Sequence, residues 1–143
     1  MKTTIRGKIG KTLAIFGLLT LPFAYSNFLP TSLSSDLLPD YIKNHFIREV
    51  TFGLTLVGFT VFTITRPLTQ KTFRTIALLG SAVVVPFWIA WTFGWSVGGM
   101  EAVWGEAIDA SGAYMIHVPQ ASLFFIGLAF LWAELRKQNS EET

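Results

Sequence analysis

The stretch VTFGLTLVGFTVFTITRP, residues 50–67, decides the class of this protein. Its first 16 residues carry no charge, and Arg66-Pro67 then ends the run, because the residue before a proline is biased out of the helical region. An uncharged apolar run of this kind is typical of a helix that crosses a lipid bilayer. Three further uncharged windows surround it, namely Thr12–Leu29, Thr75–Met100 and Ala110–Ala133.

These four windows predict an all-α integral membrane four-helix bundle. A span needs about 20 apolar residues to cross about 30 Å of hydrocarbon, so a chain of 143 residues has little left for a soluble domain. We predict one membrane domain over residues 1–143, with spans at about 10–29, 47–65, 75–97 and 113–133. Pro86 removes a backbone donor in the third span and predicts a kink between two helical halves, 75–85 and 87–97.

Composition excludes several classes of function. The chain is 51% hydrophobic and 14% charged, whereas soluble domains are about 25% charged. The net charge of +2 is too small to indicate a nucleic-acid partner. Since the chain has no cysteine, disulfides, thiolate metal sites and a catalytic cysteine are excluded.

The distribution of basic residues predicts the orientation. With the N-terminus inside, segments 1–11, 66–74 and 134–143 are cytoplasmic and hold nine of the 11 basic residues. The outer segments keep only Lys43 and Arg48. The positive-inside rule therefore predicts four spans with both termini in the cytoplasm, and a bacterial inner membrane is the expected location.

The first span has a second interpretation. Basic residues, an apolar stretch from Leu13 to Phe23 and then Ala24-Tyr25-Ser26 resemble a secretory signal with a small-x-small cleavage site. Against this, the uncharged stretch continues to Leu29. We favour a retained span, and cleavage after Ser26 would leave three spans in the same orientation.

The outer segment 35–46 is predicted to form a short interfacial amphipathic helix. Ser35 is a suitable N-cap, and Leu37, Leu38, Tyr41, Ile42 and Phe46 fall on one half of the helical wheel. The alternative is that this segment forms the first turns of the second span. Pro39 makes a continuous helix less favourable.

Two groups of residues on the outer side are candidates for a cofactor-binding site. His45 and His117 both map to the outer surface, and imidazoles from neighbouring helices can ligate a metal or a haem. Trp88, Trp91 and Trp95 share one face of the third span, which suits helix packing or a groove for a flat apolar ligand such as a quinone. The sequence leaves the cofactor unknown. Histidines at a membrane interface are more often satisfied by water or backbone than by a metal, so we predict no metal ligands and no catalytic residues.

The middle of each span lacks charged residues, which disfavours a transporter. Ion-coupled transporters usually carry ionisable groups inside the membrane, and here the mid-span polar residues are serine and threonine. Small residues indicate where helices can approach closely. Gly94 and Gly98 match the small-xxx-small pattern in the third span, and Gly53 and Gly58 allow close approach in the second.

The layout resembles the DoxX-like group of small four-span bacterial membrane proteins. The resemblance covers most of residues 10–135 and is carried by Leu37-Leu38-Pro39, by Phe46-Ile47-Arg48-Glu49 running into the glycine-bearing span 52–65, and by Arg66-Pro67. It implies a four-helix membrane bundle that is sometimes an accessory subunit of a quinone-linked respiratory or sulfur-oxidising enzyme. The acidic segment 101–109 has no counterpart in the group, so no site residue is carried over.

The sequence therefore predicts a small non-catalytic membrane protein, an accessory or assembly subunit of a membrane complex. Its expected partners are membrane lipid and other membrane subunits or further copies of itself. A redox or ligand-binding subunit with a site at the outer face is the alternative, and a small-molecule transporter is the least favoured function.

Overall fold

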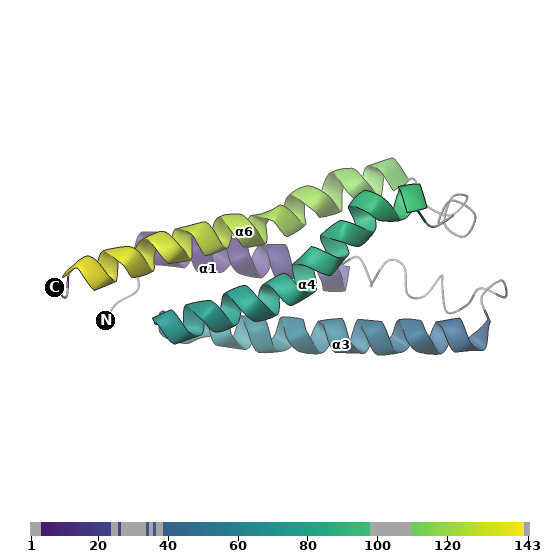
Figure 1. Cartoon of the computed structure of the whole chain (residues 1–143), viewed down its shortest axis with the longest axis horizontal. Helices are drawn as coiled ribbons and strands as arrows, with labels where there is room; N and C mark the ends of the chain where they lie inside the picture. The colour runs from purple at the N-terminus through teal and green to yellow at the C-terminus, as the bar shows by residue number, and fades with distance from the viewer. Residues whose placement is uncertain are drawn as a thin grey trace.

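The computed structural model describes residues 4–23, 26, 34, 36, 39–97 and 110–141. These residues form four long helices, α1 (Ile5–Leu18), α3 (Asp40–Thr65), α4 (Gln70–Val97) and α6 (Ala110–Glu141) (Figure 1). Within the described ranges the protein is all-helical, as predicted. Two segments, Lys43–Thr65 and Val118–Glu141, are long and apolar enough to cross a membrane.

The helices form two neighbouring pairs. The first helix packs along the last, α1 against α6, and α3 packs along α4. The ribbon of α4 begins beside α3 and ends near the start of α6, so it joins the two pairs (Figure 1). Both chain termini lie at the same end of the molecule as the α3–α4 turn (Figure 1).

The α3 helix begins earlier than the predicted second span. Its first turns are residues 40–46, so this part of the predicted interfacial helix belongs to one continuous helix that reaches Thr65. Pro39 stands at the N-cap position, before the first residue that needs an intrahelical N–H bond, and a proline there starts a helix instead of breaking it. Of residues 35–38, the structure describes only Asp36, which lies in a turn.

The α4 helix passes through Pro86 as a single element. The two halves predicted on either side of this proline are therefore one helix, from Gln70 to Val97. A proline removes one bond from the helical ladder, whereas the bonds of the turns before and after it remain. Its ribbon turns away from α3 over the second half of its length (Figure 1).

Glycine and alanine bring the backbones of α1 and α6 into contact. Gly10, Ala14 and Gly17 are buried on one face of α1 and lie against Gly127 and Phe124 of α6. A Cβ atom added at Gly127 would stand 2.7 Å from the carbonyl oxygen of Gly10, and one at Gly17 would collide with the backbone of Phe124. We call this contact the glycine seam. Side chains larger than these would force the two helices apart.

Phe124 connects the glycine seam to α4. Its side chain is fully buried, and its ring occupies the space that a side chain at Gly80 would need. The surrounding core is formed by aliphatic residues from all four helices and from the helical turn that follows α1, namely Leu18, Leu21, Val57, Ile64, Ile76, Val83, Val84 and Ala121.

The α3 helix contributes buried threonine and exposed glycine. Thr60 is fully buried, and its hydroxyl donates to the carbonyl of Leu56 over 2.7 Å, which satisfies it within its own helix. Gly58 is expected from the sequence to permit close helix approach, but a Cβ atom added there would meet no atom within 4 Å, so this residue faces open space. Gly10, Gly17, Gly80 and Gly127 make the close contacts that the structure describes.

Candidate functional site

The five predicted ligand-binding residues all lie on helix segments at the same end of the molecule (Figure 1). His45 lies in the second turn of α3 and its side chain is exposed. Trp88, Trp91 and Trp95 lie in the last part of α4, and His117 lies in the second turn of α6. The side chains of these last four residues are outside the described part, so their grouping around a ligand stays a prediction.

The arrangement of the helices is compatible with that prediction. The start of α3, the end of α4 and the start of α6 all point to the end of the molecule opposite the two termini (Figure 1). Within the residues that the structure describes, no three His, Asp or Glu side chains come together as metal ligands would.

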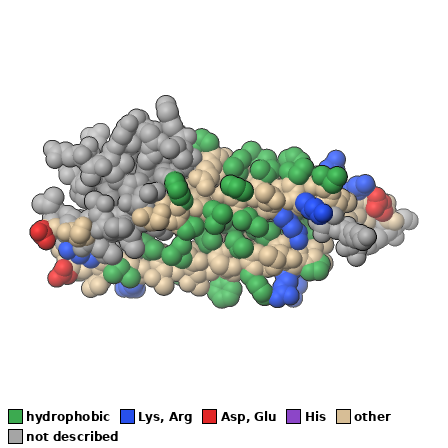
Figure 2. Space-filling view, turned by 180° about the vertical axis from the view of Figure 1, so that it is seen from behind, with side chains coloured by type: hydrophobic (Ala, Val, Ile, Leu, Met, Phe, Trp, Pro, Cys, Tyr) green, Lys and Arg blue, Asp and Glu red, His purple; other side chains and the backbone are tan. Residues whose placement is uncertain are grey.

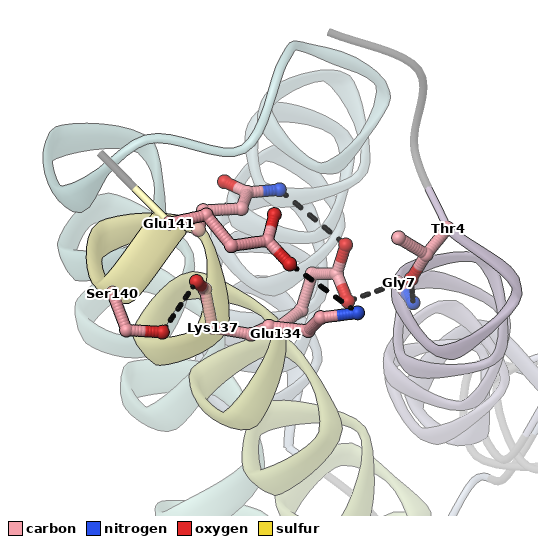
Figure 3. A network of polar contacts seen from close by, with 7 residues as sticks. Thr4, Gly7, Glu134, Lys137, Ser140 and Glu141 are labelled. Carbon is pink, nitrogen blue, oxygen red and sulfur yellow. Dashed lines mark hydrogen bonds and ion pairs between the residues drawn. The ribbon is translucent and has the colours of Figure 1, made fainter. Parts of the chain in front are cut away.

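A polar contact that the sequence did not indicate lies at the other end of the molecule. Glu134 of α6 is 1% exposed, and its carboxyl group faces the start of α1 (Figure 3). The hydroxyl of Thr4 donates to Glu134 Oε2 over 2.6 Å, and Gln138 Nε2 approaches Glu134 Oε1 at 3.4 Å. A buried carboxyl group needs such partners, because burying it without them is costly.

Thr4 has a second role in the same contact. It is the N-cap of α1, and its hydroxyl accepts a hydrogen bond from the backbone N–H of Gly7 at 3.3 Å (Figure 3). One hydroxyl therefore both caps the first helix and holds the buried carboxyl group of the last. This arrangement can fix the relative register of α1 and α6.

The sequence places Glu134 at the end of the fourth span, where a solvated residue is expected. In the structure α6 continues to Glu141, and Glu134 extends the line of buried residues formed by Phe124, Gly127 and Leu131. These positions follow one another at intervals of three or four residues, which is the spacing of one helix face. That spacing is the signal by which the burial of Glu134 could have been predicted.

A second polar contact joins the two helix pairs at the same end. The ammonium group of Lys11 in α1 donates to the backbone carbonyl of Arg66 over 2.7 Å, in the turn between α3 and α4. The guanidinium carbon of Arg66 stands 4.2 Å from the centre of the Phe62 ring, within the range of a cation–π interaction. Basic side chains thus surround this turn.

No protein-family model, curated protein or solved structure matches this chain. The resemblance to the DoxX-like group accordingly stays a hypothesis drawn from the layout of the sequence.

Proposed function

We propose that this chain is a four-span integral membrane protein of the bacterial inner membrane that serves as an accessory or assembly subunit of a membrane complex. The observation that supports membrane insertion most strongly is the chemistry of its exterior. Large apolar side chains are exposed on all four described helices, among them Phe16, Phe52, Phe59, Phe62, Leu78, Ile126 and Trp132.

The interior and exterior together favour lipid as the surrounding medium. A soluble bundle of this size buries its large apolar residues and rarely exposes them as a continuous surface. Here the seam at the centre is made of glycine and alanine, and a band of hydrophobic side chains covers the middle of the visible face (Figure 2). Small residues inside and large apolar residues outside is the arrangement expected of helices packed within a bilayer.

The charges support an orientation with both termini in the cytoplasm. Lys and Arg side chains gather toward one end of the molecule, beyond the hydrophobic band (Figure 2). This end is formed by the start of α1, the α3–α4 turn and the end of α6, which contain Arg6, Lys8, Lys11, Arg66, Lys71, Arg74, Arg136 and Lys137. An excess of basic residues marks the cytoplasmic side of bacterial membrane proteins.

The accessory role is supported by what the chain consists of. Nearly all of its described residues belong to the four helices, so little chain is available for a separate catalytic domain. The outer face of α3 also carries aromatic side chains at Tyr41, Phe52 and Phe59, which are exposed and available to neighbouring lipids or subunits. The resemblance to DoxX-like proteins points to the same class of function.

Membrane insertion is tested by alkaline extraction of membranes that contain the full chain, followed by reporter fusions after Lys137 and within segment 101–109. We expect the protein in the membrane pellet and a C-terminal reporter that is active in the cytoplasm only. Release into the supernatant would remove the membrane proposal, and a C-terminal reporter active outside would reverse the orientation.

The accessory role is tested separately. A tagged full chain, solubilised in mild detergent from its native membrane, should migrate on a native gel with a larger complex whose other subunits are identified by mass spectrometry. A chain that always migrates alone, or with lipid only, would contradict an accessory role and leave the membrane location intact.

The alternative proposal is a ligand-binding subunit with its site at the outer face. It is favoured by one observation, that the segments carrying His45, His117 and the tryptophans of α4 lie at one end of the molecule (Figure 1). Protein purified in mild detergent should then show haem or quinone absorbance, and the band should be lost in both His45→Ala and His117→Ala. A spectrum without absorbance at wavelengths longer than the protein band would exclude haem. Organic extraction of the purified protein would then show whether it carries a quinone.

A further inference from the structure

The turn between α3 and α4 is held by hydrogen bonds of threonine side chains. The α3 helix ends at Thr65 and α4 begins at Gln70. The backbone N–H of Thr69 donates to the hydroxyl of Thr72 over 2.7 Å, and the N–H of Thr72 donates to the hydroxyl of Thr69 over 3.1 Å. The Thr72 hydroxyl also lies 2.9 Å from the carbonyl of Pro67. This turn therefore holds the residues on either side of it in fixed positions.

Four cations surround this turn, and we call them the basic turn: Lys11, Arg66, Lys71 and Arg74. The ammonium group of Lys11 is attached to the carbonyl of Arg66, as described above. Lys71 and Arg74 are exposed and stand three residues apart, so they share one face in the first turns of α4. The guanidinium of Arg66 is exposed and lies over the ring of Phe62.

Within the part of the chain that the structure describes, the basic turn forms no ion pair. The sequence contains no Asp or Glu between Val50 and Met100. Among the residues that the structure describes, the ion pair is Lys137 with Glu141, at 3.5 Å in α6, and none of the four cations takes part in one. A group of like charges gathered around one turn is stabilised when an anion binds it.

An apolar surface continues from the basic turn along the helices. Phe59 and Phe62 precede Arg66 by seven and four residues, so the three share one face of α3, and both rings are exposed. On α4, Leu78 follows Arg74 by four residues and is 72% exposed. A cationic group above an exposed apolar surface matches a ligand with an anionic head and hydrocarbon tails.

The same charges disfavour a second copy of the chain on this face. Two copies inserted in the same orientation and related by a two-fold axis along this stripe of α3 would place Arg66 beside Arg66. Like charges brought together at an interface cost free energy, whereas a phosphate group gains from the same arrangement. Charge complementarity therefore selects an anionic lipid.

We infer that the basic turn binds the headgroup of an anionic phospholipid, with an acyl chain lying along Phe59 and Phe62. Arg66, Lys71 and Arg74 contact the phosphate, and Lys11 holds the turn from the side of α1 while adding its charge. Basic groups of this kind on the cytoplasmic side of membrane helices recognise anionic headgroups. The inference rests on the proposed membrane insertion, and it assigns the lipid class and the place where it binds.

The test uses the full chain purified in mild detergent and incubated with equal amounts of phosphatidylglycerol and phosphatidylcholine. Native mass spectrometry then measures which lipid is retained. We expect the unaltered protein to retain phosphatidylglycerol preferentially, and Arg66→Gln with Arg74→Gln to lower that preference roughly tenfold or more. Arg66→Lys with Arg74→Lys should restore most of it, because the charge is kept.

The matched control removes the same charge from the same end of the molecule. Arg136→Gln with Lys137→Gln, in the last turns of α6, should keep the preference of the unaltered protein. Helical content and a single gel-filtration peak confirm that each variant is folded.

Three outcomes would overturn the inference. These are equal retention of the two lipids by the unaltered protein, an equal loss in the α6 control, and displacement of the lipid by glycerol phosphate at matched concentration, which would indicate a site for free phosphate. A dimer that is lost in the Arg66→Gln, Arg74→Gln variant would instead assign this face to a second copy. Alkaline extraction separates the two proposals, since a chain in the membrane pellet without lipid preference contradicts this inference alone.

Discussion

The two helix pairs of this bundle are held together by different means. The α1–α6 pair joins the first and last helices of the chain, and Gly10, Gly17 and Gly127 let their backbones touch. The α3–α4 pair joins helices that are consecutive in the chain, connected by a threonine-bonded turn. Helices joined by a short turn stay together through connectivity, whereas helices at opposite ends of the sequence need a contact surface that is specific in shape.

This difference implies that the α1–α6 pair is more sensitive to substitution than the α3–α4 pair. Four experiments test the comparison, in order of decreasing expected effect. In each, the free energy of unfolding is measured by denaturing-detergent titration in mixed micelles.

The largest effect is expected from Phe124→Ala. This side chain is fully buried between the glycine seam and Gly80, and truncation leaves a cavity at the junction of the two pairs. Large-to-small substitutions of buried phenylalanine cost about 3–5 kcal/mol. The same substitution at its neighbour Phe125, which is partly exposed, should cost much less. Equal losses at the two positions would show that Phe124 does not connect the pairs.

A smaller loss is expected from Gly17→Ala. The added methyl group would collide with the backbone of Phe124, which moves only if α1 and α6 separate. Overpacking of this kind costs about 1–3 kcal/mol. The control is Gly58→Ala in α3, where the new methyl group meets open space, and the gain in helix propensity should stabilise the protein by up to about 1 kcal/mol. A Gly17→Ala variant as stable as the Gly58→Ala variant would be incompatible with a close seam.

Thr4→Val should lower the stability of the polar end of the same pair. The substitution removes the N-cap of α1 and the donor to Glu134 Oε2 while keeping the shape of the side chain. Loss of an N-cap costs about 0.5–2 kcal/mol, and the buried carboxyl group also loses its short hydrogen bond. Thr4→Ser keeps the hydroxyl and should behave like the unaltered protein. The interpretation fails if the Thr4→Val and Thr4→Ser variants unfold at the same detergent fraction.

The smallest effect is expected from Thr60→Val in α3. Thr60 is fully buried, but its hydroxyl donates to the carbonyl of Leu56 in its own helix. The substitution therefore removes no hydrogen bond between helices. We expect a change within about 0.6 kcal/mol, the average found for polar contacts inside membrane bundles. A loss as large as that of Thr4→Val would show that the α3 side also depends on buried polar contacts.

The positions of the helices could be predicted from the sequence, because length and lack of charge are local properties. The uncharged windows overlap α3, α4 and α6, and Arg66-Pro67 marks the end of α3, whereas α1 begins and ends earlier than the predicted first span. The start of α3 was harder to predict, since Pro39 is compatible with a break between two helices and with the first position before one. Only packing decides between those alternatives.

The partners of the helices could not be predicted in the same way. Of the glycines that the sequence predicts to make close contacts, Gly58 faces open space, whereas close contacts are made by Gly10, Gly17, Gly80 and Gly127. A glycine permits close approach without specifying what approaches, and Gly58 faces nothing. The burial of Glu134 could not be predicted either, because a carboxylate at the end of an apolar run is usually solvated. Its burial depends on the position of α1 alongside α6.

The glycine seam also has a consequence for the order of events during synthesis. Its two halves lie in α1 and α6, which are separated by roughly 100 residues, so α1 leaves the ribosome on the order of 5–20 s before α6. Over that interval the glycine face of α1 lacks its partner α6, whereas α3 and α4 can already pack against each other. Completion of α6 covers this face, so a chain that stops early leaves it open, and a protease or chaperone can distinguish that chain from a finished one.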